Sequence, residues 1–503
     1  MGRLKVLLLY PNGKLMNPPA ISIGLFTALL KHGGFDVALF DTTLYSNPDE
    51  VGSDDAKEEN LQVRPFNYAE RDIKLKNTSM RVDLVKKIVE YRPDIIAVSV
   101  LESTYPAAAS MLQVMEGLNL PVIVGGVFAT FAPEIILTNK CVSAVCIGEG
   151  EGAIIDFCKK IAVGEDWSDI ENICYKKGDK IIRNKLRKLV EINNLPVPDY
   201  SLFETERFYR PMAGKVYRTI PIETNRGCPY TCTFCNSPAI TQLYKSDNLI
   251  GFFRKKNIDR IQKELRFLVK KWNAEYVYFT SDTFLAINDE EFDRFIDIYK
   301  EFMLPFWLQS RPETITEYRA KKLKKVGCHR ISIGLEHGNK EYRKTVLKKK
   351  FDNDQMARAS KILANAGIPL TVNNIIGFPD ETRELIFDTI ELNRQLIYDT
   401  TNCAVFAPFH GTHLQQVCVE RGYVLADYTP GSLNVDVALN MPNISKEEIK
   451  GLRRTFALYA RMPKDLWPKI RRAEKFDEEG NRIFSELKKI YQEKYFNVDK
   501  SSL

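Results

Sequence analysis

Three cysteines lie close together in the stretch RGCPYTCTFCNSP, which spans residues 226–238. They are Cys228, Cys232 and Cys235, so their spacing is C-x3-C-x2-C. Cysteine thiolates are the usual protein ligands of structural zinc and of iron–sulfur clusters. Three thiolates are one short of a closed site, so either the fourth position is filled from elsewhere or it is left open.

Several kinds of chemistry fit these thiols. A structural zinc site needs four nitrogen or sulfur ligands, and the nearest histidines along the chain are His32 and His329. Disulfides leave one of three thiols unpaired and are disfavoured in a reducing compartment. A [4Fe–4S] cluster fits better, because its fourth iron can bind a small molecule that carries adjacent amine and carboxylate groups. Zinc and chemically inert thiols remain the alternatives.

The elements around the cysteines alternate between strand and helix. RTIPIET, residues 218–224, is a mostly apolar run that predicts a strand directly before the first cysteine. Five more strands are predicted further along the chain, at residues 275–280, 306–311, 330–336, 369–377 and 402–408. Six strand–helix units with right-handed crossovers predict a partial (β/α)6 barrel.

The three cysteines after the first strand of a barrel resemble the radical S-adenosylmethionine (SAM) superfamily. This resemblance implies that the vacant iron binds the amine and carboxylate of SAM, and that one electron from the cluster cleaves SAM to a 5′-deoxyadenosyl radical. It also implies contacts with SAM at positions that match the motifs of the superfamily: Phe234, Asp282 in FTSDTF, Arg311 in QSR, Glu336 in ISIGLEHG and Gly377 in IIGFPDET. One departure is Ser281, which stands where relatives often carry an acid.

Two histidines occur in the segment APFHGTHL, residues 407–414, which resembles the PxPGTPL segment that closes the barrel. His410 and His413 replace two prolines of that segment. Histidine titrates near neutral pH, so both are candidate catalytic acid–base groups. The alternative is that both are ordinary loop residues.

The first part of the chain, residues 1–160, also alternates between helices and nearly uniformly apolar strands. This pattern predicts a doubly wound parallel sheet, whose ligands bind beyond the carboxyl ends of the strands. The segments expected there resemble those of the cobalamin-binding domain of cobalamin-dependent radical SAM enzymes, of the class B methyltransferase kind. The resemblance implies cobalamin contacts at Asn12, Ser99, Gly125, Gly126, Gly148, Glu149 and Gly150.

One motif of other cobalamin domains is missing. They supply a lower cobalt ligand through D-x-H-x-x-G, whereas this chain has NGKLMN, residues 12–17, without histidine. The resemblance therefore implies a cobalt that no histidine binds. The alternative is a scaffold domain that has lost cobalamin.

The whole chain of 503 residues is expected to be an α/β protein in four parts. These are a Rossmann-like cobalamin-binding domain (1–160), a connector (161–217), a partial TIM-like radical SAM barrel (218–415) and a mainly helical C-terminal region (416–503). The stretch 49–60, with six acids and one lysine, predicts a solvated insertion between residues 44 and 80.

Composition excludes several classes of protein. The formal net charge of +7 is too small for this length to indicate nucleic-acid binding. No apolar run approaches the ~20 residues that span a bilayer, and no secretory signal is present. We therefore expect no nucleic-acid partner, no membrane span and a cytoplasmic location.

The resemblance implies a C-methyltransferase that moves a methyl group from SAM, through methylcobalamin, to an unactivated carbon of a substrate radical. Its substrate would be a small molecule, a peptide or a lipid, and a flavodoxin or ferredoxin would supply electrons. Three alternatives remain open: a rearrangement or cyclisation with the same cofactors, a radical SAM enzyme without cobalamin, and a non-enzymatic metal-stabilised binding protein.

Overall fold

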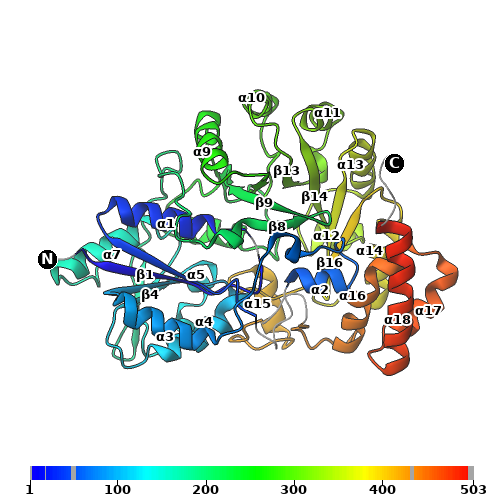
Figure 1. The fold of residues 1–503 in the computed structure, drawn as a ribbon. Helices are drawn as coiled ribbons and strands as arrows, with labels where there is room; N and C mark the ends of the chain where they lie inside the picture. Colours follow the sequence, from blue (N-terminus) through cyan, green and yellow to red (C-terminus); the bar gives the residue numbers. More distant parts are fainter. Residues whose placement is uncertain (1–2, 17, 47–52, 431–435, 497–503) are drawn as a thin grey trace.

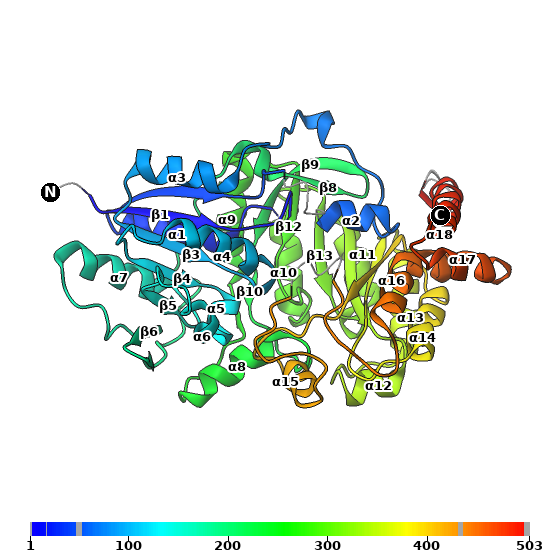
Figure 2. The same cartoon turned by 90° about the horizontal axis from the view of Figure 1, so that it is seen from below.

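The computed structural model describes residues 3–16, 18–46, 53–430 and 436–496, and Figures 1 and 2 show its fold. Two seven-stranded sheets form its body. The strand order is β2-β1-β3-β4-β5-β6-β7 in the first sheet and β16-β15-β14-β13-β12-β9-β8 in the second. Among the described residues, no helix is long and apolar enough to cross a membrane.

The first sheet confirms the predicted doubly wound domain. Its parallel strands are β1 (Lys5–Tyr10), β2 (Asp36–Asp41), β3 (Ile95–Ser99), β4 (Val122–Gly125) and β5 (Ala144–Cys146). One face packs on α1 (Ile21–His32) and α7 (Glu151–Val163), and the other on α3 (Met80–Tyr91) and α4 (Tyr105–Val114). Strands β1, β4 and β5 are buried on both faces, which explains their apolar runs, whereas the edge strand β2 is buried on one face only.

The edge of this sheet was not foreseen. Strands β6 (Ile173–Lys177) and β7 (Lys180–Arg183) extend it in antiparallel fashion, and both come from the stretch expected to be a polar connector. Half of β6 and almost all of β7 are exposed. Lysine-rich edges keep a sheet from pairing with another chain, and such edges lack the apolar signature of a buried strand.

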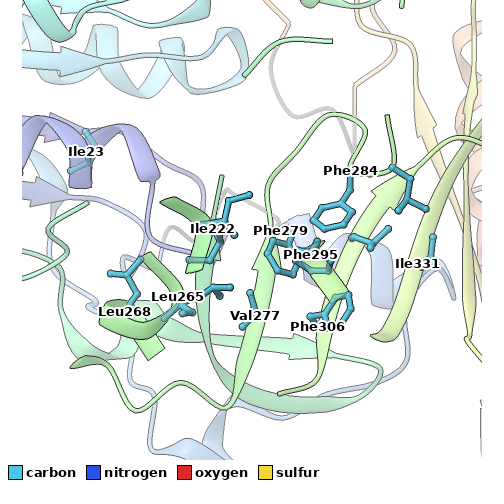
Figure 3. Close-up of a cluster of buried hydrophobic side chains, with 14 of the residues drawn as sticks. Ile23, Ile222, Leu265, Leu268, Val277, Phe279, Phe284, Phe295, Phe306 and Ile331 are labelled. Carbon is cyan, nitrogen blue, oxygen red and sulfur yellow. The ribbon is translucent and has the colours of Figure 1, made fainter. Parts of the chain in front are cut away.

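The second sheet confirms the partial barrel. Six parallel strands, β9 (Lys215–Ile222), β12 (Tyr276–Phe279), β13 (Phe306–Ser310), β14 (Cys328–Glu336), β15 (Leu370–Ile376) and β16 (Thr400–Val405), are followed at one edge by antiparallel β8 (Tyr209–Met212). The covering helices are α8 (Asn236–Ser246), α9 (Ile258–Lys271), α10 (Asp289–Tyr299), α11 (Glu317–Lys325), α13 (Asn353–Asn365) and α14 (Arg383–Arg394). Figure 3 shows how Phe279, Phe295 and Phe306 fill the space between strands and helices.

One apolar core joins the two domains. The cluster that contains Val277 and Phe279 of the barrel also contains Ile23 of α1, and Ile222 at the end of β9 belongs to it as well. Continuous apolar burial of this kind opposes relative movement of the two sheets.

The remaining helices lie around the barrel. The C-terminal helices α16 (Lys446–Arg461), α17 (Trp467–Ala473) and α18 (Glu478–Tyr491) cover β16 and α14, and α15 (His413–Glu420) precedes them. Part of the expected solvated insertion, residues 47–52, lies outside the described residues. The part that follows forms α2 (Ser53–Glu59), which lies beside the barrel and α16 rather than free in solvent (Figure 2).

Candidate active site

The three cysteines lie on the loop between β9 and α8, and all three are half-buried. Gly227 adopts φ 80°, and a Cβ there would come within 2.8 Å of the Phe252 ring, so the turn before Cys228 requires glycine. Burial raises the pKa of Cys228 to about 11 and that of Cys235 to about 12, with nearby Asp282 and the other thiols adding to the effect. Thiols of this kind give up their protons when a metal binds them.

These cysteines suit a four-iron cluster, in which each thiolate binds a different iron. Among the described residues, no three His, Cys, Asp or Glu side chains converge closely enough to hold a single metal ion. The donor set of three thiolates on one loop therefore fits a [4Fe–4S] cluster with one iron left open.

Arg311 places a cation next to this loop. Its Nη1 lies 3.7 Å from Cys232 Sγ, its guanidinium stacks on the Tyr230 ring at 3.8 Å, and its Nε donates to Glu313 Oε1 at 2.7 Å. Arg311 follows β13 directly, at the carboxyl end where barrel sites lie. A carboxylate bound to the open iron would be within reach of this guanidinium.

Asp282 and Ser281 differ in their surroundings. Asp282 is exposed, yet partial desolvation by the protein groups around it raises its pKa, and the charge of Glu223 raises it further. Asp282 is one of the charges that act on Cys228 and Cys235, which places it beside the cysteine loop. Ser281 is buried and hydrogen-bonds with Thr224, so the residue that replaces the family acid serves the packing of the loop.

Glu336 ends β14 in a strained conformation. Its φ is 66°, in the left-handed region that a side chain disfavours, and the register shifts between Gly334 and Glu336. Lys349 Nζ lies 2.8 Å from its carboxylate. Such strain costs on the order of 1 kcal/mol and is concentrated at functional sites. The carboxylate is thereby held at the carboxyl end of the strand, where the SAM ribose was expected.

Gly377 and Phe234 are brought together. Gly377 follows β15 with φ 80°, and the ring of the next residue, Phe378, lies 5.8 Å from the Phe234 ring in an edge-to-face arrangement. The backbone N–H groups of Gly377 and Phe378 both donate to the carboxylate of Glu381. The two positions matched to adenine thus belong to one apolar corner.

Sequence reasoning missed the support beneath this corner. His337 Nε2 lies 3.0 Å from Glu381 Oε1, and both side chains are fully buried. The His337 ring stacks on Tyr342 at 4.4 Å. His337 lies in the motif GLEHG and Glu381 in the motif FPDET. The sequence therefore showed both residues, but it did not show that they contact each other.

The two candidate acid–base histidines are placed elsewhere. His410 Nδ1 lies 2.5 Å from Glu102 Oε1, and its Nε2 lies 3.0 Å from the carbonyl oxygen of Ala426. His413 is exposed at the start of α15. Both ring nitrogens of His410 are therefore occupied in a contact between the domains, and neither histidine lines the cavity described next.

A cavity of about 350 Å³ lies between the first sheet and the cysteine loop. Its floor is apolar, with Leu8, Ile23 and Phe26. Six of the seven residues expected to contact cobalamin line it: Ser99, Gly125, Gly126, Gly148, Glu149 and Gly150. The strand order reverses between β1 and β3, the point at which ligands of such sheets bind.

The exception is Asn12. Its Nδ2 donates to the carbonyl oxygen of Met16 at 2.6 Å and to Thr43 Oγ1 at 2.9 Å, and the residue does not line the cavity. The side chain instead holds the loop after β1 in shape. The motif identified the correct loop but not the direction of this side chain.

The glycines of the cavity are required by close approach. Gly126 has φ 113°, and a Cβ there would meet the carbonyl oxygen of Val100 at 2.2 Å. Gly148 has φ 76°, and its Cβ would meet the hydroxyl of Tyr244 at 2.4 Å. No histidine is among the residues that line the cavity. Bare backbone over an apolar floor fits a flat, bulky cofactor, and it fits cobalamin without a histidine ligand.

A set of buried charges joins this cavity to the cysteine loop, and we call Glu149, Glu151, Arg226 and Arg254 the interdomain clamp. Arg226 Nη1 lies 2.9 Å from Glu149 Oε1 and 2.6 Å from Glu151 Oε1, and Arg254 also pairs with Glu149. Burial alone raises the pKa of Glu149, but Arg254 and Arg226 hold it below its usual value. Arg226 stands two residues before Cys228, so the cavity turn and the cysteine loop are tied directly.

Comparisons with known proteins match both halves of the chain. The radical SAM superfamily model matches residues 222–392, and the B12 binding domain model matches residues 67–157. Uncharacterized methyltransferase PH0819 of Pyrococcus horikoshii is 27% identical over 390 residues, covering 76% of this chain and 82% of that protein. Anaerobic magnesium-protoporphyrin IX monomethyl ester cyclase of Rubrivivax gelatinosus is 25% identical over 345 residues, 66% of this chain and 59% of that protein.

A solved structure supports the fold over the full length. The radical SAM methyltransferase TsrM from Kitasatospora setae, with cobalamin and a [4Fe–4S] cluster bound, superposes with a TM-score of 0.65. The two share 14% identity, and the match covers 98% of this chain and all of that chain. The similarity extends over the first sheet, the barrel and the C-terminal helices together.

Proposed function

This chain belongs to the cobalamin-dependent radical SAM enzymes, and from that premise we propose that it methylates an unactivated carbon of its substrate. The methyl group would come from SAM by way of cobalamin. The observation that carries the proposal is that Arg226 lines the cobalamin cavity while standing two residues before the first cysteine. A source of radicals and a carrier of methyl groups are thereby set side by side.

The cofactors supply the hard chemistry when bound: the cluster transfers one electron to SAM, and cobalamin carries the methyl group. The protein holds and orients them. Cys228, Cys232 and Cys235 would hold the cluster, and SAM would bind beside it with its amine and carboxylate toward the cysteine loop. Arg311 beside Cys232 would receive that carboxylate.

Other side chains would fix the remainder of SAM. Glu336, held at the end of β14 by Lys349, would accept hydrogen bonds from ribose hydroxyls. Phe234 and the backbone at Gly377 would enclose adenine, and Glu381 keeps that backbone in place through two N–H groups. Held in this way, the deoxyadenosyl group is oriented and shielded from water, which a reactive radical requires.

An external donor must reduce the cluster, and we propose a flavodoxin or ferredoxin for that role. The substrate would be a small molecule, a peptide or a lipid that reaches the space between cluster and cobalamin. His410 and His413 remain candidate acid–base groups only if the substrate itself extends to them, because His410 is already bound to Glu102.

The test begins with anaerobic reconstitution of the full chain with iron, sulfide and cobalamin. We expect four irons per chain, cleavage of SAM to 5′-deoxyadenosine and transfer of label from methyl-labelled SAM to a compound in host extracts. The variant with Cys228, Cys232 and Cys235 all changed to alanine should lose iron and cleavage but still bind cobalamin. Normal iron content in that variant would refute the cluster assignment.

One relative suggests an alternative reaction. The cyclase from Rubrivivax gelatinosus is similar in sequence to this chain over 345 residues. If the reconstituted enzyme changes a substrate without adding one CH2, a cyclisation or rearrangement replaces methylation as the proposed reaction.

A further inference from the structure

A second cavity, of about 290 Å³, lies inside the half-barrel. It shares no lining residue with the cavity between the domains. Its wall is made by inward-facing side chains of β12 to β16. Tyr278 comes from β12, and each of the other four strands contributes two residues that stand two apart, as strand geometry requires. Segments from outside the barrel close it, namely Met16 and Pro18, residues 54–66 near α2, and the turn after β8.

The inward face of these strands is polar. The lining pairs are Trp307 and Gln309, Arg330 and Ser332, Thr371 and Asn373, and Thr400 and Asn402. Outward neighbours on the same strands are fully buried apolar residues such as Leu308, Ile331 and Val372. The interior of a (β/α) barrel is ordinarily filled by branched apolar side chains. Here every inward pair offers hydrogen-bonding groups to an open space.

Hydrogen bonds between these side chains hold them in fixed directions. Asn402 Nδ2 donates to Asn373 Oδ1 at 2.9 Å, and Trp307 Nε1 donates to Ser332 Oγ at 2.8 Å. Arg330 Nη1 donates to Thr371 Oγ1 at 2.9 Å. The wall is therefore pre-arranged rather than loose.

Two atoms of this wall remain to be satisfied. Among the described residues, Arg330 Nε and Asn402 Oδ1 are buried without a hydrogen-bond partner. Arg330 is only 5% exposed. Buried polar atoms are nearly always paired, so these two indicate a ligand or water that offers both an acceptor and a donor.

The charges of the cavity are unbalanced. The described residues that line it include Lys57, Arg64, Arg210 and Arg330, but only one carboxylate, Asp54. Asp54 pairs with Arg210 at 2.7 Å. Arg64 and Arg330 both pair with Asp399, which stands behind the lining, so two guanidinium groups share one carboxylate. Guanidinium groups of this kind bind carboxylates and phosphates through paired hydrogen bonds.

Gln309 connects the cavity to Asp282, a residue beside the cysteine loop. It lines the cavity and donates from Nε2 to the carbonyl oxygen of Asp282 at 3.3 Å. Arg311 is two residues further along the same chain, about 7 Å at strand spacing. Arg330 is six residues before Glu336 on β14, about 20 Å at the same spacing. The cationic end is thus remote from the cluster, and the amide-bearing end is close to it.

We propose that this cavity binds the substrate, and that the substrate is an elongated polar small molecule with a carboxylate or phosphate at the end remote from its reacting carbon. Asn373, Asn402 and Gln309 would hydrogen-bond its middle, and Lys57, Arg64 and Arg330 would bind its anionic group. The stacked rings of Tyr278 and Trp307, 4.2 Å apart, would form a flat wall beside it. The assignment rests on the proposed function, and it disfavours a polycyclic lipid.

The binding test uses the anaerobically reconstituted full chain and inorganic pyrophosphate as the probe, followed by titration calorimetry. We expect saturable binding at one site. Lys57→Gln should weaken it by about tenfold, because it removes a charged hydrogen-bonding group from the anionic end. Asn402→Leu should leave it unchanged, because Asn402 faces the middle of the substrate. Lys14→Gln is the matched control. Lys14 pairs with Asp55, which lies on the same helix as Lys57, but Lys14 does not line the cavity. Iron content reports folding of every variant.

The substrate class is tested separately. Host extract is divided into an organic lipid fraction and an aqueous fraction, and the aqueous fraction is passed over an anion exchanger. Label from methyl-labelled SAM should appear in compounds retained by the exchanger. Label in the lipid fraction, absent pyrophosphate binding, or pyrophosphate binding that Lys57→Gln does not weaken or that Asn402→Leu weakens as much would overturn the proposal. Absent label together with normal pyrophosphate binding would instead count against the methylation reaction.

Discussion

Replacing Arg226 with methionine should destabilise the junction between the two domains. The guanidinium of Arg226 lies 2.9 Å from Glu149, 2.6 Å from Glu151 and 3.2 Å from Glu223. Methionine keeps much of the side-chain volume and removes the charge. The substitution therefore isolates the electrostatic contribution of the interdomain clamp.

The magnitude follows from burial. The side chains of Arg226 and of its three carboxylate partners are 8–16% exposed, so water screens these pairs only weakly. Removing one partner of a buried ion pair costs about 3–5 kcal/mol, because the other charge stays behind. Glu149 keeps Arg254, and Glu223 keeps Lys256 at 3.4 Å, whereas Glu151 has no other cation in the described part of the chain. We therefore expect the lower end of that range, about 3 kcal/mol.

The assay is urea unfolding of the full chain, with Arg472→Met as the matched control. Arg472 also pairs with two carboxylates, Asp477 and Glu479, both at 2.8 Å, but it is 33% exposed. Exposed pairs contribute little to stability, so this control should lose much less than Arg226→Met. Equal losses in Arg226→Met and Arg472→Met would show that the clamp does not stabilise the junction.

The effect of Arg226→Met should depend on pH. Arg254 and Arg226 hold the pKa of Glu149 below its usual value against the opposing effect of burial. A lowered carboxyl pKa contributes stability above the unfolded value and loses it as the pH falls through the folded value. The difference between wild type and variant should therefore be larger at about pH 8 than at about pH 4. A difference that stays constant would contradict the electrostatic explanation.

Three further predictions follow from single contacts. Burial lowers the pKa of His410, but the bond to Glu102 raises it above the usual value overall, so His410→Gln should cost more stability at about pH 6 than at about pH 9, as urea unfolding can measure. Gly148→Ala places a Cβ 2.4 Å from the Tyr244 hydroxyl, at a residue with positive φ. Absorbance titration should show that the affinity for cobalamin falls by about tenfold or more. An unchanged affinity would refute the assignment of this cavity to cobalamin. Glu381→Gln weakens the hydrogen bonds that hold the backbone at Gly377, so equilibrium dialysis should show that SAM binds about tenfold more weakly. An unchanged affinity for SAM would show that Glu381 does not support this part of the site.

The strands of both sheets were predictable because their residues are buried on both faces. KVLLLY and RISIGLE become β1 and β14 with nearly every residue buried. The pattern failed where a strand is exposed: β7 begins and ends with a charged residue and three of its four residues are exposed, so it resembled a loop. Apolar periodicity reports burial, and it reports strands only where the two coincide.

The candidate site was predictable as far as motifs reach. Gly148 and Glu149 were recognised from one turn, and both line the cavity. His410 and Glu102 are 308 positions apart in the sequence, so no local sequence pattern could predict that they pair. Asn12 lies in the correct loop, yet it hydrogen-bonds within that loop. Spacing identifies which loops meet at a site, whereas side-chain direction depends on tertiary contacts.

The geometry between the two cofactor sites is set by the protein itself. The apolar core that includes Ile23 and Ile222 crosses from one domain to the other. The interdomain clamp ties the cavity turn to the cysteine loop, and His410 ties the segment after β16 to Glu102. These three contacts involve no cofactor atom. A reaction in which a radical and a methyl group must meet on one carbon gains from such preorganisation, because misplacement by 1 Å can cost about a hundredfold in rate.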